Sequence, residues 1–417
     1  MTALFVQYAP RGTRLLLASS FLATVPLGYL IVVLPLYLAR AGIEPAVIGG
    51  FYTASGAMTA VLVAFSGVLA DRWGRRRFLI AGTLLPIASY LIFALTTDVP
   101  WLVFASFLGG VGLANGAAGA LTISSFDALL ADNTTEATRT KVFASSQALW
   151  SLALAFGSLC AGAPELIHRL YPAMSEIVAY RPPYLAMAVL TLCAGLVIIP
   201  IRDDPAVHRA RVASGWWPRR SRTAILTYSL AIGFLGFGLG VAVQLMPLWF
   251  NLRFGVTETD LGPWYAAAQL ASVATLAAVP FMERRLGGPR SVLVALTTSA
   301  VCLALIVVAP VFIVAAFLFL IRGFTTNLSW PFHQSLLMTA TVPEERATAV
   351  GIGFSVWGTT NALGPLAGGA LIGAGVFGLP LLVGAAMYVL GGLTFGIGFG
   401  RILAKRAADR VLADAAS

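Results

Sequence analysis

The sequence predicts an all-α membrane protein with twelve transmembrane helices. Charged residues make up 11% of the 417 residues, whereas an ordinary soluble domain carries about 25%. Hydrophobic residues make up 59% of the chain and gather in long apolar stretches with short connectors. Such stretches are helical in lipid, because each backbone polar group must find its partner within its own segment.

The distribution of basic residues predicts the orientation of these helices. If the N-terminus is cytoplasmic, all but five of the 27 Lys and Arg residues fall on the cytoplasmic side. The exceptions are one residue within a span, Arg322, and four outside, Arg40, Arg169, Arg181 and Arg253. Because basic loops are retained in the cytoplasm during insertion, we expect a multi-pass protein of the cytoplasmic (inner) cell membrane with both termini cytoplasmic.

Runs of about 20 apolar residues cross about 30 Å of hydrocarbon. In chain order, we expect spans over 14–39, 47–70, 78–96, 100–130, 141–163, 183–200, 223–250, 260–282, 291–309, 311–340, 348–375 and 380–402. The connector 201–222, with six arginines, is expected to be a cytoplasmic linker between residues 1–200 and 223–417. In the external connector 164–182, the spacing of Leu166 and Leu170 predicts a short helix lying on the surface.

The two halves of the chain repeat each other in three places. Segment 34–52 resembles 246–265, segment 71–77 has a counterpart in 284–290, and segment 146–162 matches 353–369. The matched residues include Pro35 with Pro247, Gly42 with Gly255, Trp150 with Trp357 and Gly157 with Gly364. Three matches in the same order indicate a duplication, which predicts two pseudo-symmetric six-helix bundles related by an axis along the membrane normal.

The connector between the second and third spans identifies a family. It reads GVLADRWGRRR at 67–77 and resembles the signature loop of the major facilitator superfamily, Gly-x-Leu-x-Asp-Arg-x-Gly-Arg-Arg. The matching positions are Gly67, Leu69, Asp71, Arg72, Gly74, Arg75 and Arg76. The resemblance implies that spans 1, 4, 7 and 10 line a central cavity, and that solute crosses by alternating access.

The resemblance also implies a latch on the cytoplasmic side. Asp71 would cap the start of span 11, because a carboxylate is favoured at a helix N-terminus, and Arg75 would reach Asp127. In the alternative interpretation, the basic residues only set the orientation. Asp127 is the only acid in the interior of a predicted span, so it is also a candidate proton carrier.

Span 10 carries two ionisable residues, Arg322 and His333. A charge at the mid-depth position of Arg322 costs roughly 2.5–3.5 kcal/mol, and Asp127 lies about 24 Å away in depth, at about 1.5 Å per residue. We therefore expect Arg322 to contact an anionic or acceptor-rich substrate, or else to tie helix carbonyls together. His333 follows three helical turns later on the same face, as a candidate proton carrier or a neutral, hydrogen-bonded residue.

Further polar residues are expected to line the substrate cavity. They are Tyr29, Asn115, Gln244, Asn251 and Asn327. Two departures from the family pattern bear on the subclass. Efflux members often carry an arginine in span 4, where this chain has Ser106 or a glycine, and drug exporters often carry Gly-Pro in span 5, where this chain has Gly157–Ser158.

The sequence therefore predicts a secondary active transporter and not an enzyme. The glycine-rich run at 109–116 lies in a span, and the loops show neither metal-ligand spacing nor a nucleophile–base pair. No cofactor and no nucleic acid partner are expected, since the net charge of +10 suits loops facing an anionic leaflet. We expect a monomer in contact with membrane lipids that moves a small organic solute by proton-coupled efflux. The alternatives are an importer or facilitator of an anionic metabolite, and a lipid translocator or non-transporting receptor on the same scaffold.

Overall fold

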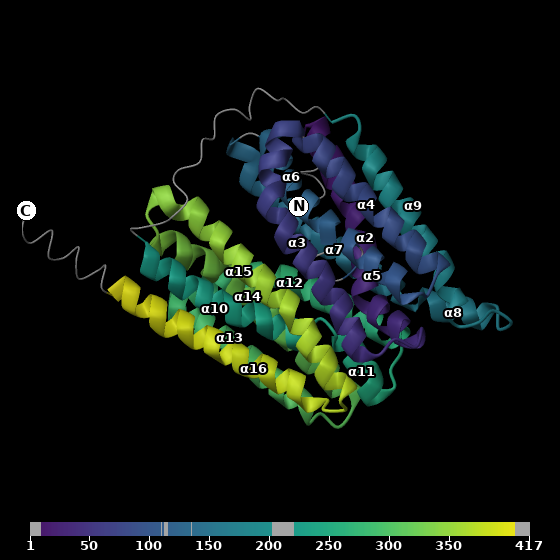
Figure 1. Ribbon diagram of the computed structural model, residues 1–417. Coiled ribbons are helices and arrows are strands. Elements are labelled where there is room, and N and C mark those ends of the chain that lie inside the picture. Colours follow the sequence, from purple (N-terminus) through teal and green to yellow (C-terminus); the bar gives the residue numbers. More distant parts are fainter. Residues whose placement is uncertain (1–9, 110, 112–115, 135, 202–220, 405–417) are drawn as a thin grey trace, which may run out of the picture. The chain divides into compact units, whose positions relative to one another are not determined.

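The computed structural model describes residues 10–109, 111, 116–134, 136–201 and 221–404 (Figure 1). Within these residues it consists of helices and connecting turns, and the described part contains no strand. The predicted all-α class is thereby confirmed. The chain divides into two compact units, and each is described by itself.

The first unit comprises Met1–Arg211, Gln244–Val273 and Pro365–Gly375. Its helices from the first sequence half are α2 (Arg11–Arg40), α3 (Pro45–Trp73), α4 (Arg75–Leu95), α5 (Val99–Leu108), α6 (Gly116–Asp132), α7 (Glu136–Leu159), α8 (Ala163–Leu170) and α9 (Arg181–Ile198). From the second half it takes α11 (Met246–Phe254), the first part of α12 (Glu258–Leu286) and the end of α15 (Arg346–Gly373). Segments of both halves thus pack together here, and the division into bundles at 1–200 and 223–417 stays a prediction.

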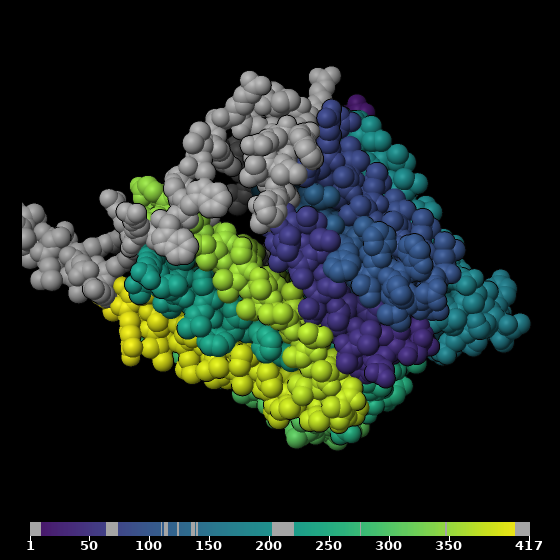
Figure 2. All heavy atoms as spheres, in the orientation of Figure 1, coloured from purple at the N-terminus to yellow at the C-terminus, as the bar shows by residue number. Residues whose placement is uncertain are grey.

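The second unit comprises Val212–Val243, Ala274–Gly364 and Val376–Ser417. Its helices are α10 (Arg222–Ala242), the rest of α12, α13 (Gly288–Val307), α14 (Phe312–Ala340), most of α15, and α16 (Gly378–Leu393), which continues as a π-helical turn, η5 (Thr394–Phe399). Helix α13 packs against both α14 and α16. Figure 2 shows the helices α5 (blue) and α16 (yellow) at the surface of their units, where Trp101, Phe104 and Leu382 are exposed, as suits contact with lipid.

Nine helices of the described chain are long and apolar enough to cross a membrane, or ten if the bent α12 is one span. A membrane-spanning protein is thereby confirmed, while the exact number of twelve spans stays a prediction. The predicted short helix in the connector 164–182 is present as α8.

Two predicted spans are not continuous helices. Span 100–130 is interrupted, because α5 ends at Leu108 and α6 begins at Gly116. Gly116 has φ +59, which glycine adopts without strain. Span 223–250 is divided as well: α10 ends at Ala242, and α11 begins at Met246 with Pro247 in its first turn, where proline needs no amide donor.

Both units contain very close helix crossings at glycines that the repeat matches, among them Gly157 and Gly364. A Cβ on Gly157 of α7 would lie 2.0 Å from the carbonyl oxygen of Val25 and 3.0 Å from the Cα of Gly28, both on α2. In the second unit, a Cβ on Gly364 of α15 would lie 2.5 Å from the Cα of Gly240 on α10. Small residues permit this backbone approach between membrane helices.

Candidate functional site

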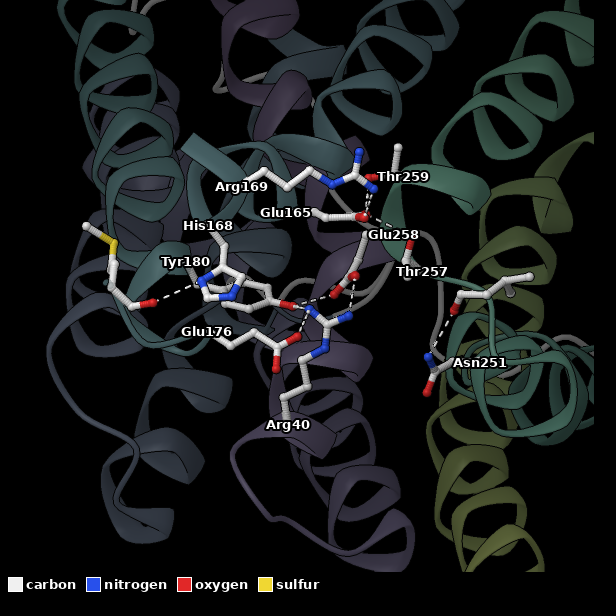
Figure 3. Close-up of polar contacts among 12 residues, drawn as sticks. Arg40, Glu165, His168, Arg169, Glu176, Tyr180, Asn251, Thr257, Glu258 and Thr259 are labelled. Carbon is white, nitrogen blue, oxygen red and sulfur yellow. Dashed lines mark hydrogen bonds and ion pairs between the residues drawn. The ribbon is translucent and has the colours of Figure 1, made fainter. Parts of the chain in front are cut away.

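A buried carboxylate, Glu258, organises a polar cluster at one end of the first unit. Glu258 opens α12, where the helix N-terminus favours negative charge, and its side chain is 2% exposed. Its Oε1 accepts a hydrogen bond from the Tyr180 hydroxyl, and its Oε2 accepts one from Arg40 Nη2 at 2.8 Å (Figure 3). A buried charge is costly unless such partners replace its hydration, so Arg40 and Tyr180 hold Glu258 in place.

Arg40 ends α2 and divides its guanidinium between two acids of different exposure. Beside the bond to Glu258, its Nη1 lies 3.3 Å from Oε1 of Glu176, whose side chain is 59% exposed. Nη1 also donates to the Tyr180 hydroxyl, and the guanidinium carbon lies 5.7 Å from the centre of the Tyr180 ring. Exposed ion pairs contribute little to stability, whereas breaking a buried pair is strongly destabilising. Glu258 is therefore a stronger partner of Arg40 than Glu176.

A second acid, Glu165 of α8, binds residues around the start of α12. Its Oε2 accepts hydrogen bonds from the hydroxyls of Thr257, at 2.9 Å, and of Thr259, and its Oε1 accepts one from Arg169. A cavity of about 220 Å³ lies among these side chains, lined by Arg40, Pro164, Glu165, His168, Arg169, Glu176, Tyr180 and Thr257. The start of α12 is thus held by side chains from α2, α8 and the turn Val178–Tyr180.

Sequence reasoning did not find this cluster. Arg40 counted only as a basic residue on the outer side, and Tyr180 and Glu258 were not singled out. The available signal was weak: Arg40, Glu176 and Glu258 are opposite charges in short connectors on the same predicted side of the membrane. Such a pattern does not say which charges meet, because their segments are far apart in the chain.

Tyr29, which was predicted to line the substrate cavity, lies at the edge of an aromatic cluster in the first unit. The rings of Tyr29 and Tyr184 meet edge to face with 6.1 Å between centroids, and Tyr37 packs on Tyr184 at 5.2 Å. The Tyr37 hydroxyl donates to the carbonyl of Phe93 at 2.8 Å. The hydroxyls of Tyr29 and Tyr184 are buried, with no hydrogen-bond partner among the described residues. Unpaired buried donors are rare in proteins, and a bound ligand would satisfy them.

Arg322 lies on α14 of the second unit and is 7% exposed. Its Nη1 donates to the Tyr388 hydroxyl of α16 at 3.3 Å, and its guanidinium carbon lies 4.9 Å from the centre of the Phe319 ring. Within the part of the chain that is described, its Nε has no hydrogen-bond partner. The contacts with Tyr388 and Phe319 support a structural role, although the partners are a hydroxyl and a ring instead of carbonyls. A contact with substrate stays a prediction.

His333 is buried among aromatic rings of the same unit. Its imidazole stacks on Phe395 of η5 with 4.3 Å between centroids and 4° between planes, and Trp330 lies 5.6 Å away. Neither ring nitrogen has a hydrogen-bond partner in the described structure, so the expected neutral, hydrogen-bonded state is not what these residues form. Arg322 packs on α16 and His333 on η5, which continues α16, so both face the same neighbour, as their spacing predicts.

The other predicted cavity residues are not brought together. Asn327 is exposed, because five residues after Arg322 turn it by about 140° around α14. Gln244 is half-buried between α10 and α11. Asn251 closes a turn, since its Nδ2 donates to the carbonyl of Val256 at 2.9 Å. Asn115 lies outside the described residues.

The signature loop is described only in part. Gly67 lies in α3, and the side chains of Asp71 and Arg72 lie outside the described ones, so the capping of span 11 by Asp71 stays a prediction. Gly74 separates α3 from α4 with φ 99, and Arg76 donates to the carbonyl of Ile199.

Arg75 of this loop pairs with an acid of α6. Its Nη1 lies 2.9 Å from Oδ2 of Asp132, five residues beyond Asp127. Asp127 itself is exposed. A pair between Arg75 and Asp127 therefore stays a prediction, while Asp132 is a partner that sequence reasoning missed.

Comparison with known proteins agrees with this loop and this fold. A family model described as Major Facilitator Superfamily matches residues 16–294. The chain is 24% identical to multidrug resistance protein 2 of Bacillus subtilis (strain 168), over 91% of this chain and 93% of the relative. It is 25% identical to multidrug resistance protein 1 of the same organism, over 59% of this chain and 60% of the relative. The solved structure of the nucleoside transporter NupG matches 93% of this chain and 99% of its own, with a TM-score of 0.67 and 15% identity. Because the family model spans more than half of the chain, this protein belongs to the major facilitator superfamily of membrane transporters.

Proposed function

We propose that this transporter exports small organic compounds from the cytoplasm in exchange for protons. The observation that carries the proposal is the similarity to multidrug resistance protein 2, which extends over more than nine-tenths of both chains. In transporters built from repeats related by an axis along the membrane normal, the substrate binds near mid-membrane at the repeat interface. Export then requires this site to open to the two sides in turn.

The aromatic cluster of the first unit supports an apolar, aromatic substrate. The rings of Tyr29, Tyr37, Tyr184 and Phe93 lie together, and the hydroxyls of Tyr29 and Tyr184 are donors without partners among the described residues. Binding sites for small organic molecules are mostly apolar, with a few polar groups that fix the orientation of the ligand. A compound with an aromatic body and a hydrogen-bond acceptor suits this combination.

Proton coupling rests on two candidates, Asp127 and His333. Asp127 is the only acid in the interior of a predicted span, and ionisable residues within the membrane often serve as proton relays. His333 is buried with both ring nitrogens unpartnered in the described structure, so no hydrogen-bond acceptor among those residues stabilises an added proton. Asp127 is therefore the stronger candidate, and His333 would need water or substrate to carry charge.

Transport in proteoliposomes tests the proposal. The probes are a lipophilic cation, a neutral aromatic compound and an aromatic carboxylate, each offered with an acidic interior and with no pH gradient. For molecules whose cytoplasmic side faces outward, the acidic interior should raise uptake of the first two probes several-fold. Asp127→Asn should abolish this rise and keep exchange of labelled for unlabelled compound. An uptake rate that is the same with and without the pH gradient would contradict proton coupling.

Import or facilitated passage of an anionic metabolite is the second candidate, and Arg322 is the observation that favours it. Arg322 is a buried cation whose Nε lacks a hydrogen-bond partner among the described residues. An anion near it would supply the missing charge compensation. The same probes decide, because this candidate predicts transport of the carboxylate alone.

A further inference from the structure

The Glu258 cluster joins segments from the two sequence halves. Arg40 and Tyr180 come from the first half and Glu258 comes from the second, and all three belong to the first unit. By the predicted topology they lie on the side of the membrane that faces outward. We propose that Arg40, Tyr180 and Glu258 form a lock that holds this outward side closed. The proposal rests on the proposed alternating access and orientation.

Close backbone packing seals the same end of this unit. A Cβ on Gly49 of α3 would lie 2.1 Å from the carbonyl oxygen of Pro365 on α15. A Cβ on Gly262 of α12 would lie 2.5 Å from the carbonyl oxygen of Ser158 on α7. Neither water nor solute fits between backbones at these distances. Opening this side therefore requires the helices of the two halves to separate, and Glu258 separates with them.

The carboxylate of Glu258 is stabilised in both the closed and the open state of the lock, but not in a state between them. In the closed state, Glu258 is desolvated and compensated by Arg40 and Tyr180. In an open state, water would hydrate the carboxylate. Pulling the pair apart without admitting water would leave a buried, uncompensated charge, which is strongly unfavourable. A contact of this kind favours all-or-none closure over gradual opening.

Glu176 belongs to the same sequence half as Arg40 and supplies a matched comparison. It bonds the same guanidinium, but its side chain is 59% exposed, whereas that of Glu258 is 2% exposed. When Glu258 moves away, Glu176 stays beside Arg40 and keeps its charge paired. Removing the charge of Glu176 should therefore leave closure almost unchanged, while removing that of Glu258 should impair it.

A pair of introduced cysteines measures closure directly. A Cβ on Gly373 would lie 3.9 Å from the Cβ of Ala46, within the range of about 3.5–4.5 Å for a disulfide. The variant carries Ala46→Cys and Gly373→Cys, with alanine at the native cysteines Cys160, Cys193 and Cys302. A mild oxidant should link the pair rapidly in the closed state and block transport, and a reductant should restore transport.

Variants of the lock are then compared by their rate of cross-linking. Glu258→Gln and Arg40→Gln should each slow it by about tenfold, because removing one partner of a buried ion pair is strongly destabilising. Tyr180→Phe, the mildest change, should slow it less, and Glu176→Gln should match the parent. The double variant of Arg40 and Glu258 should be no slower than either single one, because both singles break the same bond.

Two results would overturn the lock. One is a parental cross-linking rate in Glu258→Gln and Tyr180→Phe proteins that remain monodisperse with an unchanged melting temperature. The other is strict additivity of Arg40→Gln and Glu258→Gln. Cross-linking needs no substrate, so it can succeed where the proposed export fails. If cross-linked protein still transports, closure of this side is not a transport step, whatever the substrate.

Discussion

The helix pair α2–α7 in the first unit and the pair α10–α15 in the second both cross closely at a glycine, but different side chains form the hydrogen bonds across the two crossings. Beside its crossing, the first pair has a hydrogen bond from Ser158 Oγ to the carbonyl of Gly28 at 3.1 Å. The second has one from Asn361 Nδ2 to the carbonyl of Gly236 at 3.1 Å, one turn away from its glycine contact. The two helix pairs share this close backbone approach, while the side chains that hydrogen-bond across it differ.

Glycines in the connectors show the same shared geometry. Gly42 and the matched Gly255 both end a helix with positive φ, at 81 and 68. Gly74 and Gly287 both separate two helices with positive φ, at 99 and 70. A residue with a Cβ is strained at such φ values, so glycine ends helices at matched positions in both halves.

The buried ionisable residues are where the two units differ most. In the first unit, Arg40 meets Glu258 and Glu176, and Arg75 meets Asp132. In the second unit, Arg322 and His333 are buried beside aromatic rings, and the described residues give neither an acid. These ion pairs of the first unit thus compensate one another, whereas the charge of Arg322 has no acid beside it among the described residues.

The largest expected effect tests whether both crossings matter equally. Gly157→Ala and Gly364→Ala should each destabilise the protein by about 1–3 kcal/mol or more, because the added methyl overlaps backbone atoms. Gly358→Ala on the same α15 is the control, since a Cβ there meets nothing within 4 Å. Melting temperature and monodisperse yield in detergent measure the loss. Tolerance of Gly364→Ala alone would show that the second crossing is looser than its geometry indicates.

Substitution of Arg322 has the second largest expected effect, and it tests whether this buried cation of the second unit stabilises the fold or binds substrate. Arg322→Ala should lower stability by about 1–3 kcal/mol, in the usual range for breaking a buried polar contact, and leave substrate affinity unchanged, because Tyr388 and Phe319 already engage the side chain. Tyr388→Phe should cost less, as one long hydrogen bond is lost. Melting temperature and affinity are measured on the same purified variants. A well-folded alanine variant that no longer binds, with Arg322→Lys binding partly, would restore the predicted substrate contact.

His333 should show a smaller effect on stability and a clear one on coupling. His333→Phe keeps the stack on Phe395 and removes two unpartnered nitrogens, so the melting temperature should hold or rise. If His333 carries a proton, gradient-driven transport falls while substrate exchange persists. Transport with an unaltered response to pH would leave His333 as a packing residue, and the second unit would then contribute no titrating group from α14.

The sequence predicts what depends on local composition and fails where distant side chains meet. Apolar runs and basic loops predict the helices and their orientation, because each of these signals is local. The interruption before Gly116 escaped this reasoning, since a glycine-rich run also fits a membrane helix. The pairing of Arg40 with Glu258 joins residues far apart in the chain, and no spacing rule reaches that far. Asn327 was expected to line the cavity with Arg322, although five residues of α-helix place it about 140° away around the helix.

The smallest expected effect concerns the signature loop, where the first half has Arg75 and the matched position of the second half is Gly288. The pair of Arg75 with Asp132 is partly exposed, at 13% and 30%, so its coupling should be about 0.2–1 kcal/mol, as for other surface pairs. A double-mutant cycle with Arg75→Gln and Asp132→Asn, read from melting temperatures, measures it. The parallel cycle with Asp127→Asn should give less coupling in this state. If Asp127 couples more strongly than Asp132, Arg75 exchanges partners between conformations. The loop of the first half then forms an ion pair that the second half cannot form, because Gly288 stands at the position of Arg75.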